Sequence, residues 1–298
     1  GAELLGSRQE AFLKKWAADW KGAQFKVALH QTPLARVTTN ADQDLKRSQF
    51  DVDANGWPKA ARDRAVDLLR RGYAFSVVGD QHLSALFHYG IDAWEDSGVC
   101  FLLPASAVGF PRAWWPEEEG EGRRPGDSQY TGRFTDFLGN LMTIYGVGNP
   151  ERKVRREDPE VMAHDKASGH GMIRFNKQTG EITCECWRLL FDARNPKPGD
   201  QFPGFPRTIR LEDNYGREAK GYLPTIEVVG LQNPVISVVD ERTSELVYSL
   251  RVHGQSFEPK VFADGSYTVR VGEGASAKEL RGLKPGARGA TKTVVRFP

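Results

Sequence analysis

Apolar residues recur at helical spacing in two segments of the first third of the chain. In the first segment, Ser7 and Glu10 match a capping box, and Gly22 follows an apolar stripe. The stripe consists of Phe12, Leu13, Trp16, Ala17 and Trp20. The second segment begins at Pro58, ends at Gly72 and places Ala61, Ala65, Leu68 and Leu69 on one face. The pattern predicts two amphipathic helices.

Short apolar runs between and after these segments lack that spacing. Residues 25–29, 73–78 and 99–103 are typical of buried strands, and residues 83–88 are interpreted as a short helix. Because strands alternate with helices, the order predicts crossover connections and an α/β layer.

A long insertion rich in Pro, Gly and Trp occupies residues 104–135. Its Trp114 and Trp115 either form the wall of a substrate cleft or anchor the loop, and the acidic run 117–121 is expected to be solvated. Residues 172–175 and 182–187 then flank a turn that contains Gly180, which predicts a hairpin.

The last quarter of the chain is a series of short β runs. They centre near Ile226, Val235, Val247, Phe257, Tyr267, Leu280 and Val294. Their regular spacing, with turn residues between them, predicts a small antiparallel sandwich. The basic residues of this part either contact a phosphate-rich polymer or form an ordinary solvated face.

Composition excludes several classes of protein. The 298 residues include 41 Lys and Arg against 39 Asp and Glu, a net charge of +2, which disfavours a strongly basic nucleic-acid-binding protein. No apolar run is long enough for a membrane span, and residues 1–5 do not resemble a signal peptide. The three cysteines, Cys100, Cys184 and Cys186, are too few for a disulfide framework and are interpreted as structural thiols, their redox state left open.

Candidate metal ligands follow two of the expected strands. His30 ends the first strand, and Asp80 and His82 follow the next, where the carboxyl ends of strands carry sites in α/β sheets. Imidazole and carboxylate together suit Zn²⁺, Mn²⁺ or Fe. The alternative is that each of these is an ordinary polar residue at the point where the chain leaves the core.

Several segments resemble the calcineurin-like metallophosphatases. Residues 25–33, a strand followed by His30 and then Pro33, are similar to the strand–His–x–x–Pro segment of that family. Gly79-Asp80-Gln81-His82 resembles the closing Gly-His-x-His motif in the form found in the alkaline phosphatase D-like branch. Segments 89–92, 110–116 and 145–150 and the terminal β region also look like bacterial members of this branch.

The resemblance implies a function and a site. His30, Asp80 and His82 would be metal ligands, with Fe, Zn, Mn or Ca as the ion, and the reaction would be hydrolysis of a phosphomonoester or phosphodiester. Apart from the resemblance, the guanidinium of Arg112 in the aromatic insertion either binds the phosphate at two points or forms a surface ion pair. His88, six residues after His82, is likewise interpreted from its position, either as turning inward toward the site or as packing within its helix. The family is usually exported, which implies a periplasmic or secreted protein.

The chain departs from the family at its start. The family's Asp-x-His, Gly-Asp and Asn-His motifs do not precede His30. We therefore expect the carboxyl-terminal half of a two-layer α/β metallophosphatase sandwich over residues 1–155, a connecting segment with a hairpin over 156–221, and an all-β antiparallel sandwich over 222–298. The site would be incomplete without an amino-terminal segment. The alternative is a non-catalytic binding or scaffold protein that uses the β-sandwich and the Trp-rich loop.

Overall fold

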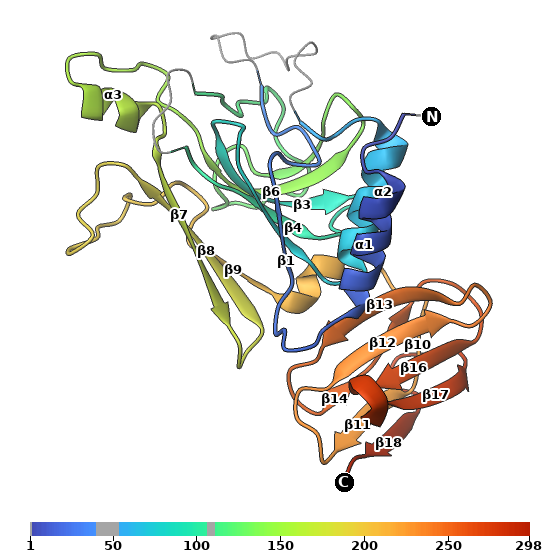
Figure 1. Cartoon of the computed structure of the whole chain (residues 1–298). Coiled ribbons are helices and arrows are strands. Elements are labelled where there is room, and N and C mark those ends of the chain that lie inside the picture. Colours follow the sequence, from blue (N-terminus) through green and yellow to red (C-terminus); the bar gives the residue numbers. More distant parts are fainter. Residues whose placement is uncertain (1, 40–53, 106–110) are drawn as a thin grey trace.

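The chain is mostly β structure in a computed structural model that describes residues 2–39, 54–105 and 111–298 (Figure 1). Within these ranges it forms three short α-helices and eighteen strands, which are divided among five sheets. The predicted fold class, half of a two-layer α/β sandwich followed by an antiparallel β-sandwich, is therefore wrong.

A mixed six-stranded sheet forms the centre of the larger part of the molecule. Its strand order is β1-β2-β4-β3-β6-β5, and β1, β2 and β4 are parallel whereas the other pairings are antiparallel. The strands span Val27–His30 (β1), Phe75–Val78 (β2), Ser84–Gly90 (β3), Val99–Leu102 (β4), Gly132–Thr135 (β5) and Leu141–Gly148 (β6).

Strand β3 is one reason for the wrong fold class. Residues 83–88 were predicted to form a helix, yet every residue of β3 is buried. A short apolar run that is buried on both faces has no alternation to distinguish a strand from a buried helix. With a strand in this position, the chain turns back antiparallel instead of crossing over.

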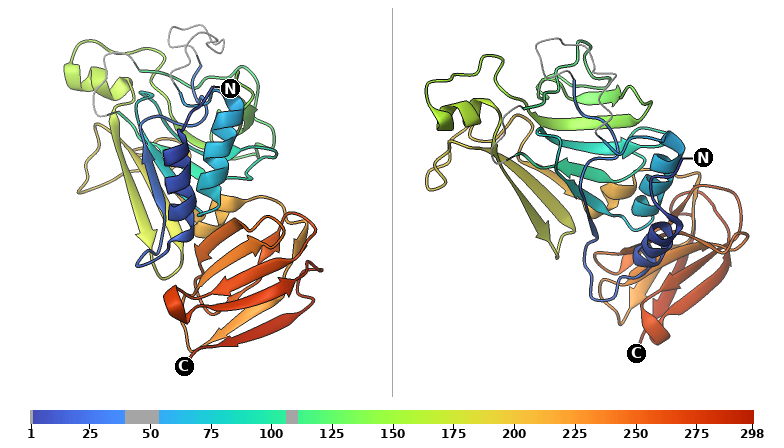
Figure 2. Two further views of the ribbon diagram at one scale, coloured as in Figure 1. Left: turned by 45° about the vertical axis from the view of Figure 1, so that its right-hand side comes forward. Right: turned by 45° about the horizontal axis from the view of Figure 1, so that its top comes forward.

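Two helices cover one face of this sheet, as the two views in Figure 2 show. They are α1 (Ser7–Ala18) and α2 (Lys59–Arg70), at the predicted positions, although Gly6 rather than Ser7 is the N-cap of α1. Ala65 and Leu69 of α2 pack with Phe87 and Leu102 of the sheet in one apolar cluster.

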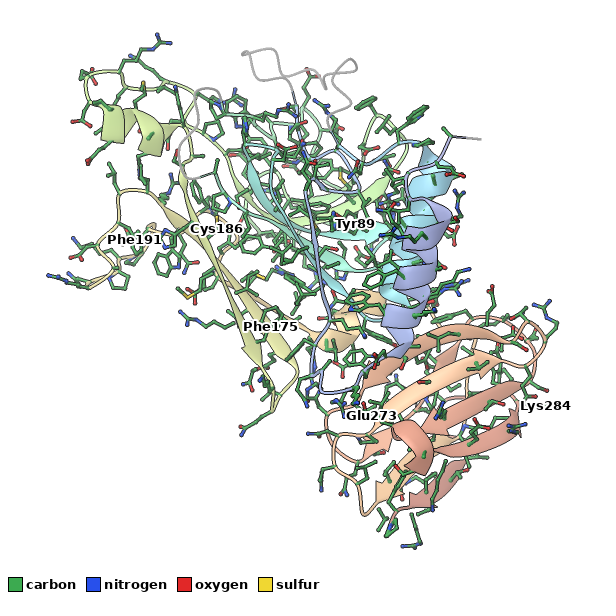
Figure 3. All side chains as sticks on the ribbon, viewed as in Figure 1. Tyr89, Phe175, Cys186, Phe191, Glu273 and Lys284 are labelled. Atoms are coloured by element: carbon green, nitrogen blue, oxygen red, sulfur yellow. The ribbon has the colours of Figure 1, made fainter. Side chains whose placement is uncertain are left out.

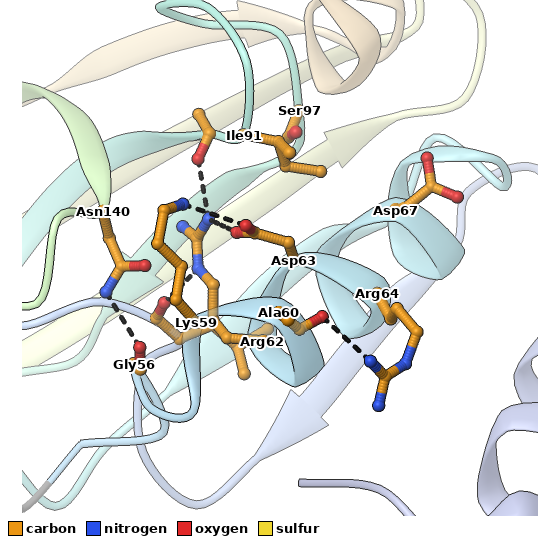
Figure 4. Close-up of polar contacts among 12 residues, drawn as sticks. Gly56, Lys59, Ala60, Arg62, Asp63, Arg64, Asp67, Ile91, Ser97 and Asn140 are labelled. Carbon is orange, nitrogen blue, oxygen red and sulfur yellow. Dashed lines mark hydrogen bonds and ion pairs between the residues drawn. The ribbon is translucent and has the colours of Figure 1, made fainter. Parts of the chain in front are cut away.

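A buried arginine joins α2 to this sheet (Figure 4). The side chain of Arg62 is fully buried, its Nε donates to the carbonyl of Leu34 at 2.6 Å, and its Nη1 donates to the carbonyl of Gly90 at 2.7 Å. Nη1 also pairs with Asp63 at 2.9 Å. Arg62 therefore links the helix to the segment that follows β1 and to the end of β3.

A second, three-stranded sheet covers the opposite face of the central sheet. Its strands are β7 (Gly169–Asn176), β8 (Glu181–Arg188) and β9 (Arg207–Arg210), preceded by the short helix α3 (Pro159–Asp165). Cys184 and Cys186 of β8 pack against Phe75 and Phe101. Figure 3 shows Cys186 and Phe175 on this hairpin, which is the predicted one.

The C-terminal β module, residues 221–298, lies below the central sheet in Figure 1. Each of the seven predicted positions falls in a strand, but the strands form three small sheets, and β11 and β18 pair in parallel. They are β10 (Gly221–Tyr222), β11 (Thr225–Val229), β12 (Val235–Asp240), β13 (Glu245–Arg251), β14 (Ser256–Phe257), β15 (Lys260–Val261), β16 (Tyr267–Val271), β17 (Lys278–Leu283) and β18 (Lys292–Arg296). A single antiparallel sandwich is therefore not formed.

No helix in the described ranges has the length and apolar character that crossing a membrane requires.

Candidate functional site

The predicted metal ligands lie at the carboxyl ends of β1 and β2. His30 is the last residue of β1 and is in register with Val78, the last residue of β2. The amide of Gly79 donates to the carbonyl of Gln31 at 3.1 Å, so the two chain segments stay side by side beyond the strands. The structure thus brings His30 and the turn of residues 79–82 to one edge of the sheet.

The turn after β2 has an unusual backbone. Asp80 and His82 both adopt left-handed φ angles, 68° and 51°, whereas the Gln81 between them is buried. Gln81 donates through Nε2 to the Thr32 hydroxyl at 2.9 Å and accepts at Oε1 from Arg112 at 3.2 Å. Buried, hydrogen-bonded Gln81 fixes the turn, and left-handed residues that are held in this way cluster at functional sites.

His30 carries a ring nitrogen that has no hydrogen-bond partner. Its Nδ1 lies 3.0 Å from the carbonyl oxygen of Thr32, and because a carbonyl can only accept, Nδ1 must carry the proton. Burial lowers the pKa of the ring, so it is neutral at neutral pH. Its Nε2 is therefore an unprotonated acceptor, buried and unpaired among the described residues.

This arrangement is the one that metal-binding histidines commonly adopt. A backbone carbonyl that accepts from one ring nitrogen fixes the tautomer and presents the lone pair of the other nitrogen to the ion. The donor types at this edge, two imidazoles and a carboxylate, suit a borderline transition metal. The described part of the chain nevertheless contains no group of three His, Cys, Asp or Glu side chains placed to hold an ion together.

Arg112 lies beside the turn of residues 79–82. Its backbone amide donates to the carbonyl of His82 at 3.2 Å, and its guanidinium reaches Gln81. These two contacts place a cationic side chain at the same edge as His30 and Asp80.

His88 lies elsewhere on the sheet. It pairs in register with Val99 of β4 and Thr143 of β6, four residues along β3 from the end that faces the turn. Its Nδ1 is 2.6 Å from the Tyr145 hydroxyl and its Nε2 is 2.7 Å from the carbonyl of Asp213. Both ring nitrogens are engaged there, so the structure does not bring His88 to the other four predicted site residues.

A polar cleft around His88 was not predicted from the sequence. Glu95 forms a two-point ion pair with Arg133, in which Nε and Nη2 of the arginine each lie 2.9 Å from a carboxylate oxygen. Glu95 also accepts a hydrogen bond from the Thr143 hydroxyl at 2.6 Å. The guanidinium of Arg207 lies 4.1 Å from the centre of the Tyr145 ring. These residues come from distant parts of the chain and share no local motif, so no pattern in the sequence indicated them.

The tryptophan pair of the long insertion is buried. Trp114 is 1% exposed and Trp115 is 8% exposed, and the Trp114 ring packs edge-on against Phe134. Of the two sequence interpretations, anchoring of the loop is therefore the one that the packing supports.

The three cysteines are free and buried. Burial raises the pKa of the Cys184 and Cys186 thiols to about 12 and also raises that of Cys100. Because only the thiolate binds metal or attacks an electrophile, none of the three contributes reactive chemistry at neutral pH.

Protein-family models, curated proteins and solved structures were all compared with the chain, and none of them matches it.

Proposed function

We propose that the carboxyl edge of β1 and β2 carries ligands of a metal-dependent phosphoric ester hydrolase. The observation that carries this proposal is His30, a neutral, half-buried imidazole whose Nδ1 is held by Thr32 and whose buried Nε2 has no partner among the described residues. An unpaired buried polar atom is costly, by about 1–3 kcal/mol, and such an atom calls for a ligand.

The proposed roles follow from the position of each group. His30, Asp80 and His82 would hold the ion, and Arg112 would bind the phosphate oxygens as a guanidinium can do at two points. When bound, a divalent or trivalent ion of Fe, Zn, Mn or Ca would supply Lewis-acid activation of the ester and of water. The chain's own contribution is to fix His30 in one tautomer and to present Asp80 and His82 outward by burying Gln81 between them.

The proposal includes an additional segment of chain that completes the site. Strand β1 is an outer strand of the central sheet, and Leu29 on it is 78% exposed. An apolar groove of about 580 Å³ runs beside it, lined by Leu29, His30 and Phe12 among others. A further strand added to β1 would cover this apolar surface and could bring the ligands that the described residues lack.

Elemental analysis together with hydrolysis of aryl phosphate esters tests the proposal. We expect near-stoichiometric metal and turnover of a monoester or a diester in the wild-type chain, and loss of both in His82→Ala with the fold retained by circular dichroism. The matched control is His170→Ala, which changes an exposed histidine of β7 and should leave metal and turnover unchanged. Equal metal content in wild type and His82→Ala would contradict the ligand assignment.

The alternative, a non-catalytic binding or scaffold protein, is distinguished by the same experiment. On that alternative, metal is absent or unaffected by His82→Ala, and the substitution changes only stability. The burial of Trp114 and Trp115 weakens this alternative, because buried rings cannot contact a polymer or partner.

A further inference from the structure

The polar cleft at the far end of β3 and β6 has the character of a binding site. A cavity of about 490 Å³ is lined by residues that include Glu95, Arg133, Tyr145 and Arg207. A smaller cavity of about 280 Å³ is lined by His88 and shares Glu95, Tyr145 and Arg207 with the larger one. The volume of the larger cavity is in the usual range for small-molecule sites.

At the base of the cleft, His88 and Tyr145 form a hydrogen bond whose donor and acceptor can be assigned. Because the carbonyl of Asp213 can only accept, Nε2 of His88 carries the proton. Burial lowers the pKa of His88, so the ring is neutral and Nδ1 accepts a hydrogen bond from the Tyr145 hydroxyl. The Tyr145 oxygen keeps its lone pairs, so it can accept a hydrogen bond from a bound hydroxyl group.

The charges around this base are not all paired. The larger cavity has four arginines, Arg123, Arg124, Arg133 and Arg207, against three carboxylates, Glu95, Glu121 and Asp127. Arg133 is neutralised by Glu95, and Arg123 lies 3.3 Å from Glu119. In the smaller cavity, the carboxylate of Asp213 accepts from the backbone amide of Arg210.

Arg207 is one of the two arginines of the larger cavity that have no carboxylate partner among the described residues. It stacks on Tyr145, and no ion pair of its guanidinium is formed within residues 2–39, 54–105 and 111–298. A guanidinium fixed on an aromatic ring keeps its planar set of donors available for an oxyanion. Arg124, at the mouth of the cleft, forms no ion pair in the described ranges either.

We propose that this cleft binds a small hydroxylated organic anion, with its phosphate or carboxylate group on Arg207 and a hydroxyl group on Tyr145. The shared chemistry is an oxyanion next to hydroxyl groups. The cleft lies at the opposite end of β3 from the proposed metal ligands, so the inference does not depend on the proposed function.

Calorimetric titration with three matched probes tests this inference. We use α-glycerophosphate, glycerate and glycerol, which share a backbone and differ in carrying a phosphate, a carboxylate or no charge, at constant ionic strength and neutral pH. Binding of either anion without binding of glycerol is expected, and the two anions distinguish a phosphate site from a carboxylate site. Failure of both anions to bind, or equal binding of glycerol, would overturn the proposal.

Substitutions then locate the site. Loss of one charged hydrogen bond in Arg207→Gln should weaken binding about tenfold or more, and Arg124→Gln provides a second variant at the mouth. The control Arg281→Gln removes another exposed arginine, from β17 in the C-terminal β module, where it pairs with Glu279, and should leave affinity unchanged. Equal weakening by Arg207→Gln and Arg281→Gln would show a general charge effect and refute the site. His82→Ala should leave the affinity unchanged.

Discussion

Arg62 provides a stability test of how the segment that carries His30 and Thr32 is held. Its fully buried guanidinium donates to the carbonyls of Leu34 and Gly90 and pairs with Asp63. Arg62→Met keeps the length of the side chain and removes these three interactions. Two buried carbonyls are then left without their donor.

The expected loss follows from these contacts. Each unpaired carbonyl costs about 1–2 kcal/mol, and the pair with half-exposed Asp63 adds about 1 kcal/mol or less. The substitution also recovers about 1 kcal/mol of the free energy of unfolding, because it removes Nη2 of Arg62, which is buried without a partner among the described residues. The free energy of unfolding should therefore fall by about 3 kcal/mol.

Urea unfolding followed by tryptophan fluorescence measures this loss. The control is Arg64→Met on the same helix, where the arginine side chain is 51% exposed and lies 3.4 Å from Glu10. An exposed pair of this kind contributes about 0.5 kcal/mol or less. If Arg62→Met and Arg64→Met changed the free energy of unfolding equally, the buried link between α2 and the central sheet would be refuted.

Three further predictions concern the thiols, the histidine of the cleft and a tight glycine. All three cysteines should resist a disulfide reagent in the native protein and react on unfolding in urea, because burial raises the pKa of their thiols. Fast reaction before unfolding would contradict this prediction. The folded-state pKa of His88 is lowered, so only the unfolded chain takes up its proton as the pH falls below about 6.5, and stability should decrease on acidification. His88→Gln should show a shallower decrease between about pH 7 and pH 5 in urea unfolding, and an unchanged slope would contradict the assignment. Gly216→Ala should lower the free energy of unfolding by about 2 kcal/mol or more, because an added Cβ would lie 2.0 Å from the carbonyl oxygen of Glu95. An unchanged midpoint of urea unfolding in this variant would contradict the prediction.

The sequence predicted elements where one face of a segment is buried. The apolar stripes of α1 and α2, and the regularly spaced β runs of the C-terminal β module, were predicted at the positions where the structure has helices and strands. Strand β3 was assigned to the wrong class because both of its faces are buried, and the pairing of β11 with β18 joins segments that no local pattern connects. Periodicity reports burial within an element, and it does not report which elements pair.

The same distinction applies to the two candidate sites. His30 and the turn of residues 79–82 could be placed at one edge because each directly follows a strand, and parallel neighbours end together. The polar cleft depends on Arg207 meeting Tyr145 and Glu95, which come from β9, β6 and the loop after β3. That meeting is produced by the packing of the second sheet on the first, which the sequence did not predict.

The protonation state of the His30 ring tests most directly the central claim that His30 is a metal ligand. Long-range nitrogen–proton NMR of the six histidines, with nitrogen-labelled histidine and His30→Gln for assignment, reports which ring nitrogen carries the proton. We predict a neutral His30 ring that is protonated on Nδ1, and a shift of its Nε2 signal when Zn²⁺ is added. A proton on Nε2, or a Nε2 signal that Zn²⁺ leaves unchanged, would contradict the metal-ligand assignment.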